Sequence, residues 1–393
     1  MKTKIILASA FLAASLCFSC DYFKTASKEP DLAENPDMPL NMPAESSGTK
    51  IQVAILLDTS NSMDGLIEQA KSRLWNIVNT LTTLKYEGKN PTIEIALYEY
   101  GNDGLSSSTN FIRQVTPLST DLDLISEKLF SLRTNGGNEY CGAVIQDAAQ
   151  KLDWGSEKGN MKLVYIAGNE PFTQGPVSYK EVVSDALKKD IYVNTIFCGE
   201  NSEGISSGWK DGADKGQGKY FNIDPDQKVR YIATPYDDQI YKCNERLNKT
   251  YLGYGSHGEE REQMQEVQDR NAESVSSSNY AERAVSKSKA VYKNDSWDLV
   301  DKVKDDKKAL ENIKKSELPK ELQNKSTEEI KAIVETKARE REAVQKEMAD
   351  LAKKRQKFID AEAKKQKVKD DLGNAIASSI KDFAKAKGYT FEK

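Results

Sequence analysis

The segment of residues 51–57 restricts the fold of this chain more than any other feature. It reads Ile-Gln-Val-Ala-Ile-Leu-Leu, a nearly continuous apolar run that ends at Asp58. A run of this length is typical of a strand that is buried on both faces of a parallel sheet. From Leu66 to Leu81 the apolar residues recur every three or four positions, which is helical spacing. A buried strand followed at once by a helix indicates the start of an α/β fold.

The alternation of strands and helices continues along the chain. Further strand-like segments lie at 92–98, 162–167 and 191–197, and helix-like segments lie between them at 122–132, 141–151 and 179–189. This order predicts a doubly wound, mostly parallel sheet, a Rossmann-like α/β architecture. Ligands of such folds bind beyond the carboxyl ends of the strands, so we expect the functional side chains at that edge.

Asp58, Ser60 and Ser62 stand directly after the first predicted strand, in the sequence Asp-Thr-Ser-Asn-Ser. Alternate residues of a tight strand-to-helix loop point the same way, so one carboxylate and two hydroxyls face one point. Hard oxygen donors of this kind suit Mg²⁺, Mn²⁺ or Ca²⁺ and suit softer metals poorly. The alternative is that Ser60 or Ser62 merely caps the following helix.

This motif resembles the metal-ion-dependent adhesion site (MIDAS) of the von Willebrand factor A (VWA) domain. The resemblance implies a VWA domain at 49–232, a bound Mg²⁺ (or Mn²⁺ or Ca²⁺), and a protein partner whose acidic side chain completes the metal shell. It also implies that a second loop supplies Thr after a Gly pair and that a third loop supplies Asp before Gly. In this chain Asn138 follows the Gly pair, and Gly168 stands where that Asp is expected.

Four residues of these two loops carry oxygen donors that offer a substitute for the missing groups. A carboxylate from Glu139 or Glu170 would replace the absent Asp, which gives a variant site. Its candidate ligands are Asp58, Ser60, Ser62, Asn138, Glu139, Asn169 and Glu170. The alternative is that these polar groups bond to one another and to the loop backbone without a metal.

The amino-acid sequences at 167–176, 196–199 and 209–213 also resemble those of a group of exported VWA proteins from Bacteroidetes-like bacteria. This resemblance implies no known reaction.

The N-terminus is predicted to be a targeting segment. Two lysines precede an apolar stretch at 5–16 that is too short for a permanent membrane span. Residues 1–20 end in Cys-Phe-Ser-Cys, which resembles a bacterial lipobox with Cys20 as the lipidated residue; ordinary secretion is the alternative. Residues 21–48 are expected to be a disordered tether. The predicted location is the cell envelope, lipid-anchored to a bacterial membrane, most simply the outer membrane on its periplasmic or surface face.

An exported chain lies in a compartment where disulfides form. Cys141 begins a predicted helix and Cys198 ends a strand, so both are expected at the carboxyl edge of the sheet. A Cys141–Cys198 disulfide is therefore a hypothesis. The alternative is two buried free thiols that pack as small apolar groups.

Beyond a connector at 233–258, residues 259–393 are dominated by Lys, Glu, Gln, Ala and Arg, which predicts a region of long helices, coiled-coil-like in part. Ser326 and Glu329 form a capping-box pattern that opens one helix. The apolar row that follows keeps a seven-residue rhythm only partly, since Arg341 and Arg355 interrupt it.

The composition limits the possible functions. His257 is the only histidine, and there is no Gly-rich phosphate loop, so we expect no enzyme. With 57 basic and 61 acidic residues, the overall charge gives no general reason to expect binding to nucleic acid. The expected function is an envelope-anchored adhesion or scaffold module that binds a protein partner through a variant divalent-cation site. The alternative is a metal-free structural assembly protein that acts through its C-terminal helices.

Overall fold

The computed structural model describes residues 48–393 except 225, 228, 366–371 and 392–393. The predicted signal peptide, Cys20 and almost all of the predicted tether lie outside the described residues. All described residues belong to one compact unit, 41–393. Within this part of the chain, none of the helices is long and apolar enough to cross a membrane.

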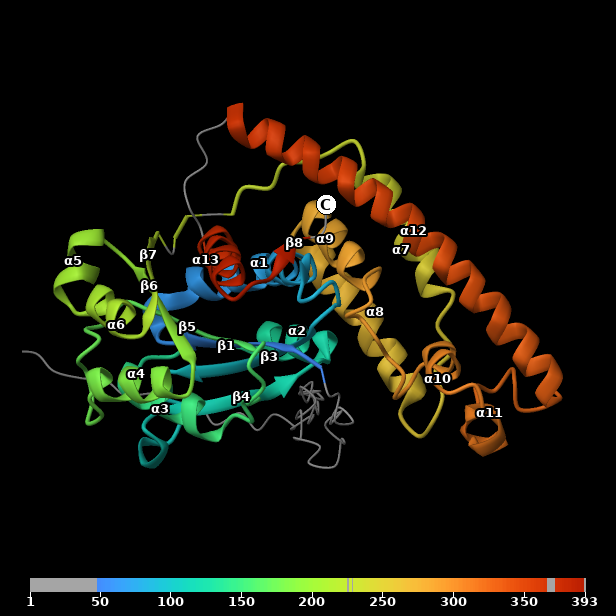
Figure 1. Ribbon diagram of the computed structural model, residues 1–393, viewed down its shortest axis with the longest axis horizontal. Helices are drawn as coiled ribbons and strands as arrows, with labels where there is room; N and C mark the ends of the chain where they lie inside the picture. Colours follow the sequence, from blue (N-terminus) through green and yellow to red (C-terminus); the bar gives the residue numbers. More distant parts are fainter. Residues whose placement is uncertain (1–47, 225, 228, 366–371, 392–393) are drawn as a thin grey trace, which may run out of the picture. The chain divides into compact units, whose positions relative to one another are not determined.

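A six-stranded sheet forms the centre of the α/β part (Figure 1), in the order β4-β3-β1-β5-β6-β7. The strands are β1 (Lys50–Asp58), β3 (Thr92–Tyr100), β4 (Ile112–Ser119), β5 (Met161–Gly168), β6 (Ile191–Cys198) and β7 (Gln217–Ile223). All neighbours pair in parallel except β4, which runs antiparallel to β3. The predicted mostly parallel sheet is therefore confirmed, and the predicted strands are its four central ones.

Helices cover both faces of the sheet. They are α1 (Asp64–Leu81), α2 (Leu122–Ser131), α3 (Cys141–Lys151), α4 (Tyr179–Lys188), α5 (Asn201–Ser206) and α6 (Trp209–Lys215). Successive residues of a strand point to opposite faces, so β1 contributes to two cores. Val53 and Leu57 pack with α1 and α2, whereas Ala54 and Leu56 pack with α3, α4 and α6. This double burial explains why the β1 sequence is apolar almost throughout.

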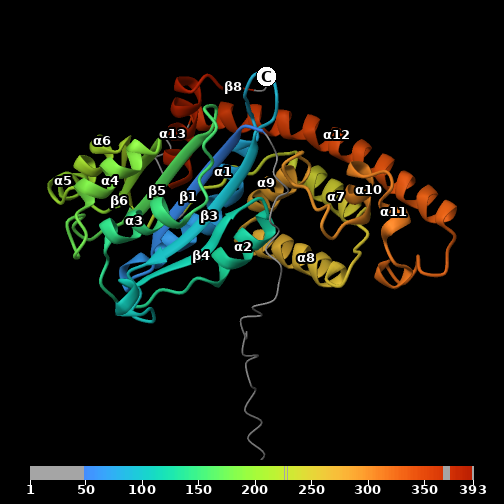
Figure 2. The same cartoon turned by 60° about the horizontal axis from the view of Figure 1, so that its bottom comes forward.

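A helical region follows β7 (Figure 2). Its first helix, α7 (Asp237–Asn248), lies in the segment predicted as a connector at 233–258. The helices that follow belong to the predicted helical region 259–393 and are α8 (Gly258–Val275), α9 (Ser277–Lys287), α10 (Leu299–Asp305), α11 (Ala309–Asn312) and α12 (Thr327–Lys365). At the start of α12 the backbone N–H of Glu329 donates to Ser326 Oγ at 3.2 Å, and that of Ser326 donates to Glu329 Oε2 at 2.8 Å. The predicted capping box is therefore confirmed.

The two arginines that interrupt the apolar row of α12 are buried ion-pair partners. Arg341 Nη1 lies 2.6 Å from Asp298 Oδ2, and Arg355 Nε lies 2.8 Å from Asp237 Oδ1. The guanidinium of Arg341 also lies over the ring of Tyr251, 4.2 Å from its centroid. The broken seven-residue rhythm thus reflects ionic contacts of α12 with α7 and with the N-terminus of α10.

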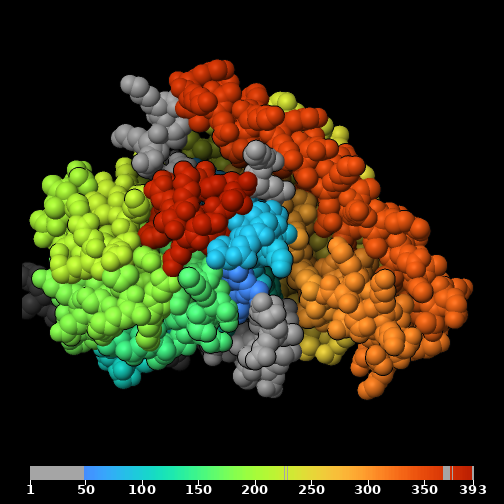
Figure 3. Space-filling view, in the orientation of Figure 1, coloured from blue at the N-terminus to red at the C-terminus, as the bar shows by residue number. Residues whose placement is uncertain are grey.

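The last helix returns to the α/β part. α13 (Leu372–Ala386) packs against α1 and contacts β5 and β7, and its Ile376 and Ile380 are fully buried in the core on the α1 face. In the space-filling view α13, in red, lies directly against green and blue segments of the α/β part (Figure 3). Beyond it, β8 (Thr390–Phe391) pairs antiparallel with β2 (Leu84–Lys85). The predicted helical region 259–393 therefore includes a segment that belongs to the α/β core.

Candidate functional site

Asp58 lies at the carboxyl end of the central strand β1 and is fully buried. Its Oδ1 accepts a hydrogen bond from the backbone N–H of Ser60 at 2.7 Å. Its Oδ2 has no hydrogen-bond partner in the described part of the chain. Burial of a carboxylate oxygen without a hydrogen-bond partner costs free energy, so we expect this atom to bind a ligand or a proton.

The serines of the motif lie beside Asp58 and are joined to the third loop. Ser60 Oγ and Ser62 Oγ are 3.2 Å apart, and Asn169 Nδ2 donates to Ser62 Oγ at 3.1 Å. Asn169 Oδ1 is buried and, among the described residues, lacks a partner. The loops after β1 and β5 therefore bring two hydroxyls and an amide oxygen to one place.

Glu139 brings a second carboxylate to Asp58. It is 4% exposed, and its backbone N–H donates to Gln174 Oε1 at 2.7 Å, which fixes the second loop against the third. Its Oε2 is another buried atom with no partner in the described structure. Burial raises the pKa of Asp58 well above its ordinary value, and the neighbouring Glu139 raises it further. Burial also raises the pKa of Glu139. Two buried carboxyl groups in contact favour a bound cation or a shared proton.

Two glycines make room for this pair. A Cβ on Gly101, whose φ is +79°, would lie 2.7 Å from Glu139 Cγ. A Cβ on Gly168 would lie 2.5 Å from the Tyr100 hydroxyl and 3.1 Å from Asp58 Oδ2. The Asp that the resemblance places at position 168 has no space here, and Glu139 supplies a carboxylate from the second loop instead. Sequence reasoning missed Gly101 and Tyr100; a glycine soon after a predicted strand was the only signal for the first.

The contact between Gly168 and Tyr100 gives a direct test of this packing. We expect Gly168→Ala to lower the free energy of unfolding by about 1–3 kcal/mol, because the added methyl group overlaps the Tyr100 hydroxyl. That hydroxyl donates to Ala167 O at 3.0 Å and is not free to move away. Urea unfolding of the single and double variants measures the effect. Tyr100→Phe should recover much of the loss in the Gly168→Ala background, and a Gly168→Ala protein as stable as the wild type would contradict the close packing.

The predicted ligands do not all converge. Asp58, Ser60, Ser62, Glu139 and Asn169 form the centre described above. Asn138 is exposed, and its side chain makes no hydrogen bond to any described residue. Glu170 is half-buried beside the centre, and its negative charge acts on Glu139. Asn138 and Glu170 therefore lie at the rim rather than in the centre.

The hypothetical Cys141–Cys198 disulfide is not present. Both cysteines are buried and free. Cys141 packs in the core on the α3 face, with its Sγ 3.8 Å from the Tyr100 hydroxyl, whereas Cys198 packs in the core on the α1 face. The two side chains thus belong to opposite faces of the sheet, which sequence position alone did not reveal. Burial raises the pKa of both thiols well above the ordinary value.

The residues of the centre fit a hard divalent cation. Asp58 Oδ2, Glu139 Oε2 and Asn169 Oδ1 are buried oxygens without partners in the described structure, and the hydroxyls of Ser60 and Ser62 lie beside them. This set contains only oxygen donors, which is the preference of Mg²⁺, Mn²⁺ and Ca²⁺. The described residues contain no group of three or more His, Cys, Asp or Glu side chains that could hold a metal, so any cation here depends on the serines and the amide.

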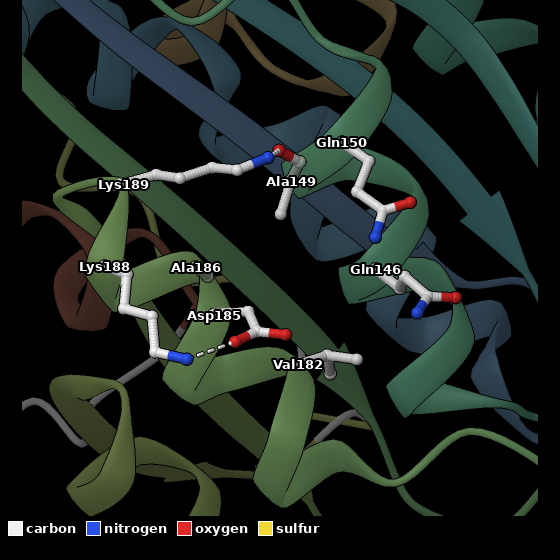
Figure 4. Close-up of a pocket in the computed structure, with 8 residues that line it drawn as sticks. All are labelled: Gln146, Ala149, Gln150, Val182, Asp185, Ala186, Lys188 and Lys189. Carbon is white, nitrogen blue, oxygen red and sulfur yellow. Dashed lines mark hydrogen bonds and ion pairs between the residues drawn. The ribbon is translucent and has the colours of Figure 1, made fainter.

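A pocket away from the Asp58 centre lies between α3 and α4 (Figure 4). It has a volume of about 250 Å³ and is lined by Gln146, Ala149, Gln150, Val182, Asp185, Ala186, Lys188 and Lys189. Its charged groups already have partners: Lys188 Nζ lies 2.7 Å from Asp185 Oδ1, and Lys189 Nζ donates to Ala149 O at 3.1 Å. The unpartnered oxygens of the Asp58 centre make that centre the better candidate site.

Comparison with known proteins gives one family. Residues 52–222 match the family model described as von Willebrand factor type A domain. No curated protein matches the chain.

Among solved structures, the chain is similar to conserved hypothetical protein BatB from Bacteroides thetaiotaomicron, with 16% identity, 44% of this chain and 90% of that chain covered, and a TM-score of 0.34. It is similar to an aerotolerance-related membrane protein from Bacteroides fragilis, with 17% identity, coverage of 45% and 93%, and a TM-score of 0.32. It is also similar to proximal thread matrix protein 1 from the mussel byssus with a zinc-occupied MIDAS motif, with 14% identity and a TM-score of 0.36. That match covers 46% of this chain and 43% of the mussel protein, less than half of its length.

Proposed function

We propose that the protein is a binding module that recognises a protein partner through a divalent cation, because residues 52–222 match the von Willebrand factor type A family model. VWA domains commonly mediate interactions between proteins, and some carry a MIDAS metal. The observation that carries the proposal is the set of three buried, unpartnered oxygens on Asp58, Glu139 and Asn169, counted over the described residues. A cation held by these residues would offset the cost of burying such oxygens without partners.

The residues of the centre have distinct roles in this proposal. Asp58 and Glu139 supply two negative charges, which balance one divalent ion, and Ser60 and Ser62 supply neutral oxygens. The Ser60 N–H holds the Asp58 carboxylate in place, and Asn169 orients the Ser62 hydroxyl. A Mg²⁺, Mn²⁺ or Ca²⁺ ion held by these residues would supply the positive charge that attracts an oxygen of the partner, an acidic side chain in the simplest case.

We further propose that the module acts without catalysis and from the cell envelope, anchored to a bacterial membrane through lipid on Cys20. The support for the anchor is the sequence of residues 1–20, with its basic start, apolar stretch and terminal Cys-Phe-Ser-Cys. Labelling of the expressed full chain with a fatty-acid analogue tests the anchor. Equal labelling of the Cys20→Ser protein would exclude it.

Metal binding is tested by thermal and urea unfolding. We expect Mg²⁺ or Mn²⁺ to stabilise the wild-type protein relative to EDTA, by about 2.7 kcal/mol at a metal concentration 100 times the dissociation constant. Glu139→Gln should lose most of this stabilisation, because it removes one of the two charges that face the cation. Asn138→Ala is the matched control, since the Asn138 side chain is exposed, and it should retain the full effect. A wild-type protein that is indifferent to both metals would favour the metal-free assembly role.

A further inference from the structure

We propose that the partner presents a basic protein surface around its contact with the cation. This inference rests on the proposed function for the centre of the site and adds the chemistry of the surface that surrounds it. The surface is formed by five of the loops at the carboxyl edge of the sheet, 59–64, 101–111, 133–140, 169–178 and 199–208, the last of which contains α5.

These loops carry a strong excess of negative charge. Besides the buried Glu139, their acidic residues are Asp64, Asp103, Glu170, Glu200 and Glu203, which we call the acidic rim. Their single basic residue is Arg133, whose Nη1 donates to the carbonyl oxygens of Phe130 at 2.9 Å and Leu132 at 2.8 Å. The whole chain is nearly balanced, with 57 basic and 61 acidic residues, so this excess is local.

The acidic rim differs from much of the remaining surface because its loops contain almost no basic side chains. Elsewhere residues of both signs are mixed, and some of them form ion pairs, as in Lys210–Asp214 at 2.6 Å and Arg246–Glu347 at 2.6 Å. Within the described structure, no residue of the acidic rim takes part in an ion pair, and only Asp64 accepts a side-chain hydrogen bond, from the Thr134 hydroxyl. Five unpaired acids on one face repel one another and create a negative potential that attracts a basic surface.

The acidic rim is attached to the cation centre. Asp64 contacts Thr134, and the backbone N–H of Asp103 donates to Gly136 O, so both are tied to the loop that carries Glu139. Glu170 follows the central Asn169. Glu200 precedes α5 and Glu203 lies within it, and the end of α5 is held to the third loop by the hydrogen bond from Phe172 N to Ser207 O at 3.0 Å. A divalent cation offsets only Asp58 and Glu139, so the charge of the acidic rim remains when the centre is filled.

A large apolar side chain on the same face indicates a protein rather than a small ion. Ile205, in α5, is 47% exposed. The other large exposed apolar residues of the described part, Tyr241 and Val267, lie on α7 and α8. An apolar contact ringed by charges is the usual composition of a protein interface. A nucleic acid, an acidic protein surface or the same face of a second copy would be repelled.

The test uses the full chain and three fluorescent peptides of about 15 residues, each with one central Glu flanked by four Lys, four Ser or four Glu. Binding is measured by anisotropy in Mg²⁺ at low and high salt. We expect the Lys-flanked peptide to bind about tenfold more tightly than the Ser-flanked one at low salt, and the advantage to shrink at high salt. The Glu-flanked peptide should bind most weakly.

Two variants of equal charge change locate the effect. Asp103→Asn/Glu200→Gln/Glu203→Gln should remove the preference for the Lys-flanked peptide. The control Glu328→Gln/Glu335→Gln/Glu342→Gln, on the exposed face of α12, should keep it. Equal affinity of the Lys-flanked and Glu-flanked peptides, or equal behaviour of the two variants, would overturn the inference. Retention of the preference in EDTA, with its loss in the rim variant, would support the basic partner and count against the cation.

Discussion

A chain that ends at Lys365 is expected to lose the folded state of its α/β part, because it lacks α13. Four large side chains of this helix, Leu372, Ile376, Ile380 and Phe383, are at most 9% exposed and pack in the core on the α1 face. Burial of such side chains contributes about 1.5–3 kcal/mol each, or roughly 6–12 kcal/mol together. This is close to the whole stability of a typical domain, about 5–15 kcal/mol.

Polar contacts add to the role of this segment. Ser379 Oγ donates to Asn194 Oδ1 at 2.8 Å inside the core, and Tyr389 Oη donates to Gly159 O at 2.8 Å. Removal of the segment takes away one of the two donors to Asn194 Oδ1, which is fully buried in β6 and keeps the backbone N–H of Lys219 at 3.0 Å. The loss of such a hydrogen bond costs about 0.5–1.5 kcal/mol.

Circular dichroism and urea unfolding measure the result. The shortened chain should lack a cooperative unfolding transition and should be digested rapidly by protease. The matched control ends at Tyr389, which keeps α13 and removes the short pairing of β8 with β2. It should unfold cooperatively, close to the full chain. A chain ending at Lys365 with the unfolding midpoint of the full chain would show that α13 is an appendage.

The central part of the fold could be predicted because its strands are buried on both faces. β1 and β5 are apolar almost throughout, and the change to helical spacing after β1 marks α1. The edge strands carry a weaker signal: β7 reads Gln-Gly-Lys-Tyr-Phe-Asn-Ile and is mostly half-exposed, so it lacks a continuous apolar run. β4 has only three buried residues, Ile112, Thr116 and Ser119, and contains a proline.

The position of α13 could not be predicted, because its apolar spacing is equally compatible with a helix of the C-terminal helical region and with a helix that packs on the sheet of the α/β part. Its contacts are remote in sequence: Leu372 N donates to Gln69 Oε1, 303 residues away, at 3.3 Å. The candidate site, too, could be predicted only in part. The motif of Asp58 identified one loop, but the choice of Glu139 over Glu170 depends on the space left by Gly101 and Gly168, which only the folded chain defines.

A buried ionic network joins α2 to α8 and α9. Arg283 is fully buried, with Nη1 2.7 Å from Asp123 Oδ1 and Nε 2.6 Å from Asp269 Oδ1. Lys287, also fully buried, lies 2.9 Å from Asp269 Oδ2. Burial by itself would raise the pKa of Asp269, but Lys287 and Arg283 outweigh it and hold that pKa well below its ordinary value. Asp269 is therefore ionised at neutral pH, while burial lowers the pKa of Lys287 to about 8.

We expect Arg283→Met to lower the free energy of unfolding by about 3–5 kcal/mol, because it leaves Asp123 buried without its cationic partner and deprives Asp269 of one of two. The stack of Arg283 over the Trp75 ring, at 4.7 Å, is lost as well. Urea unfolding measures the change. Arg270→Met on α8 is the matched control, since Arg270 pairs with Glu266 at 3.9 Å on the exposed surface, and it should shift stability by less than about 0.5 kcal/mol. Equal small effects of both substitutions would mean that the network positions the helices without stabilising them.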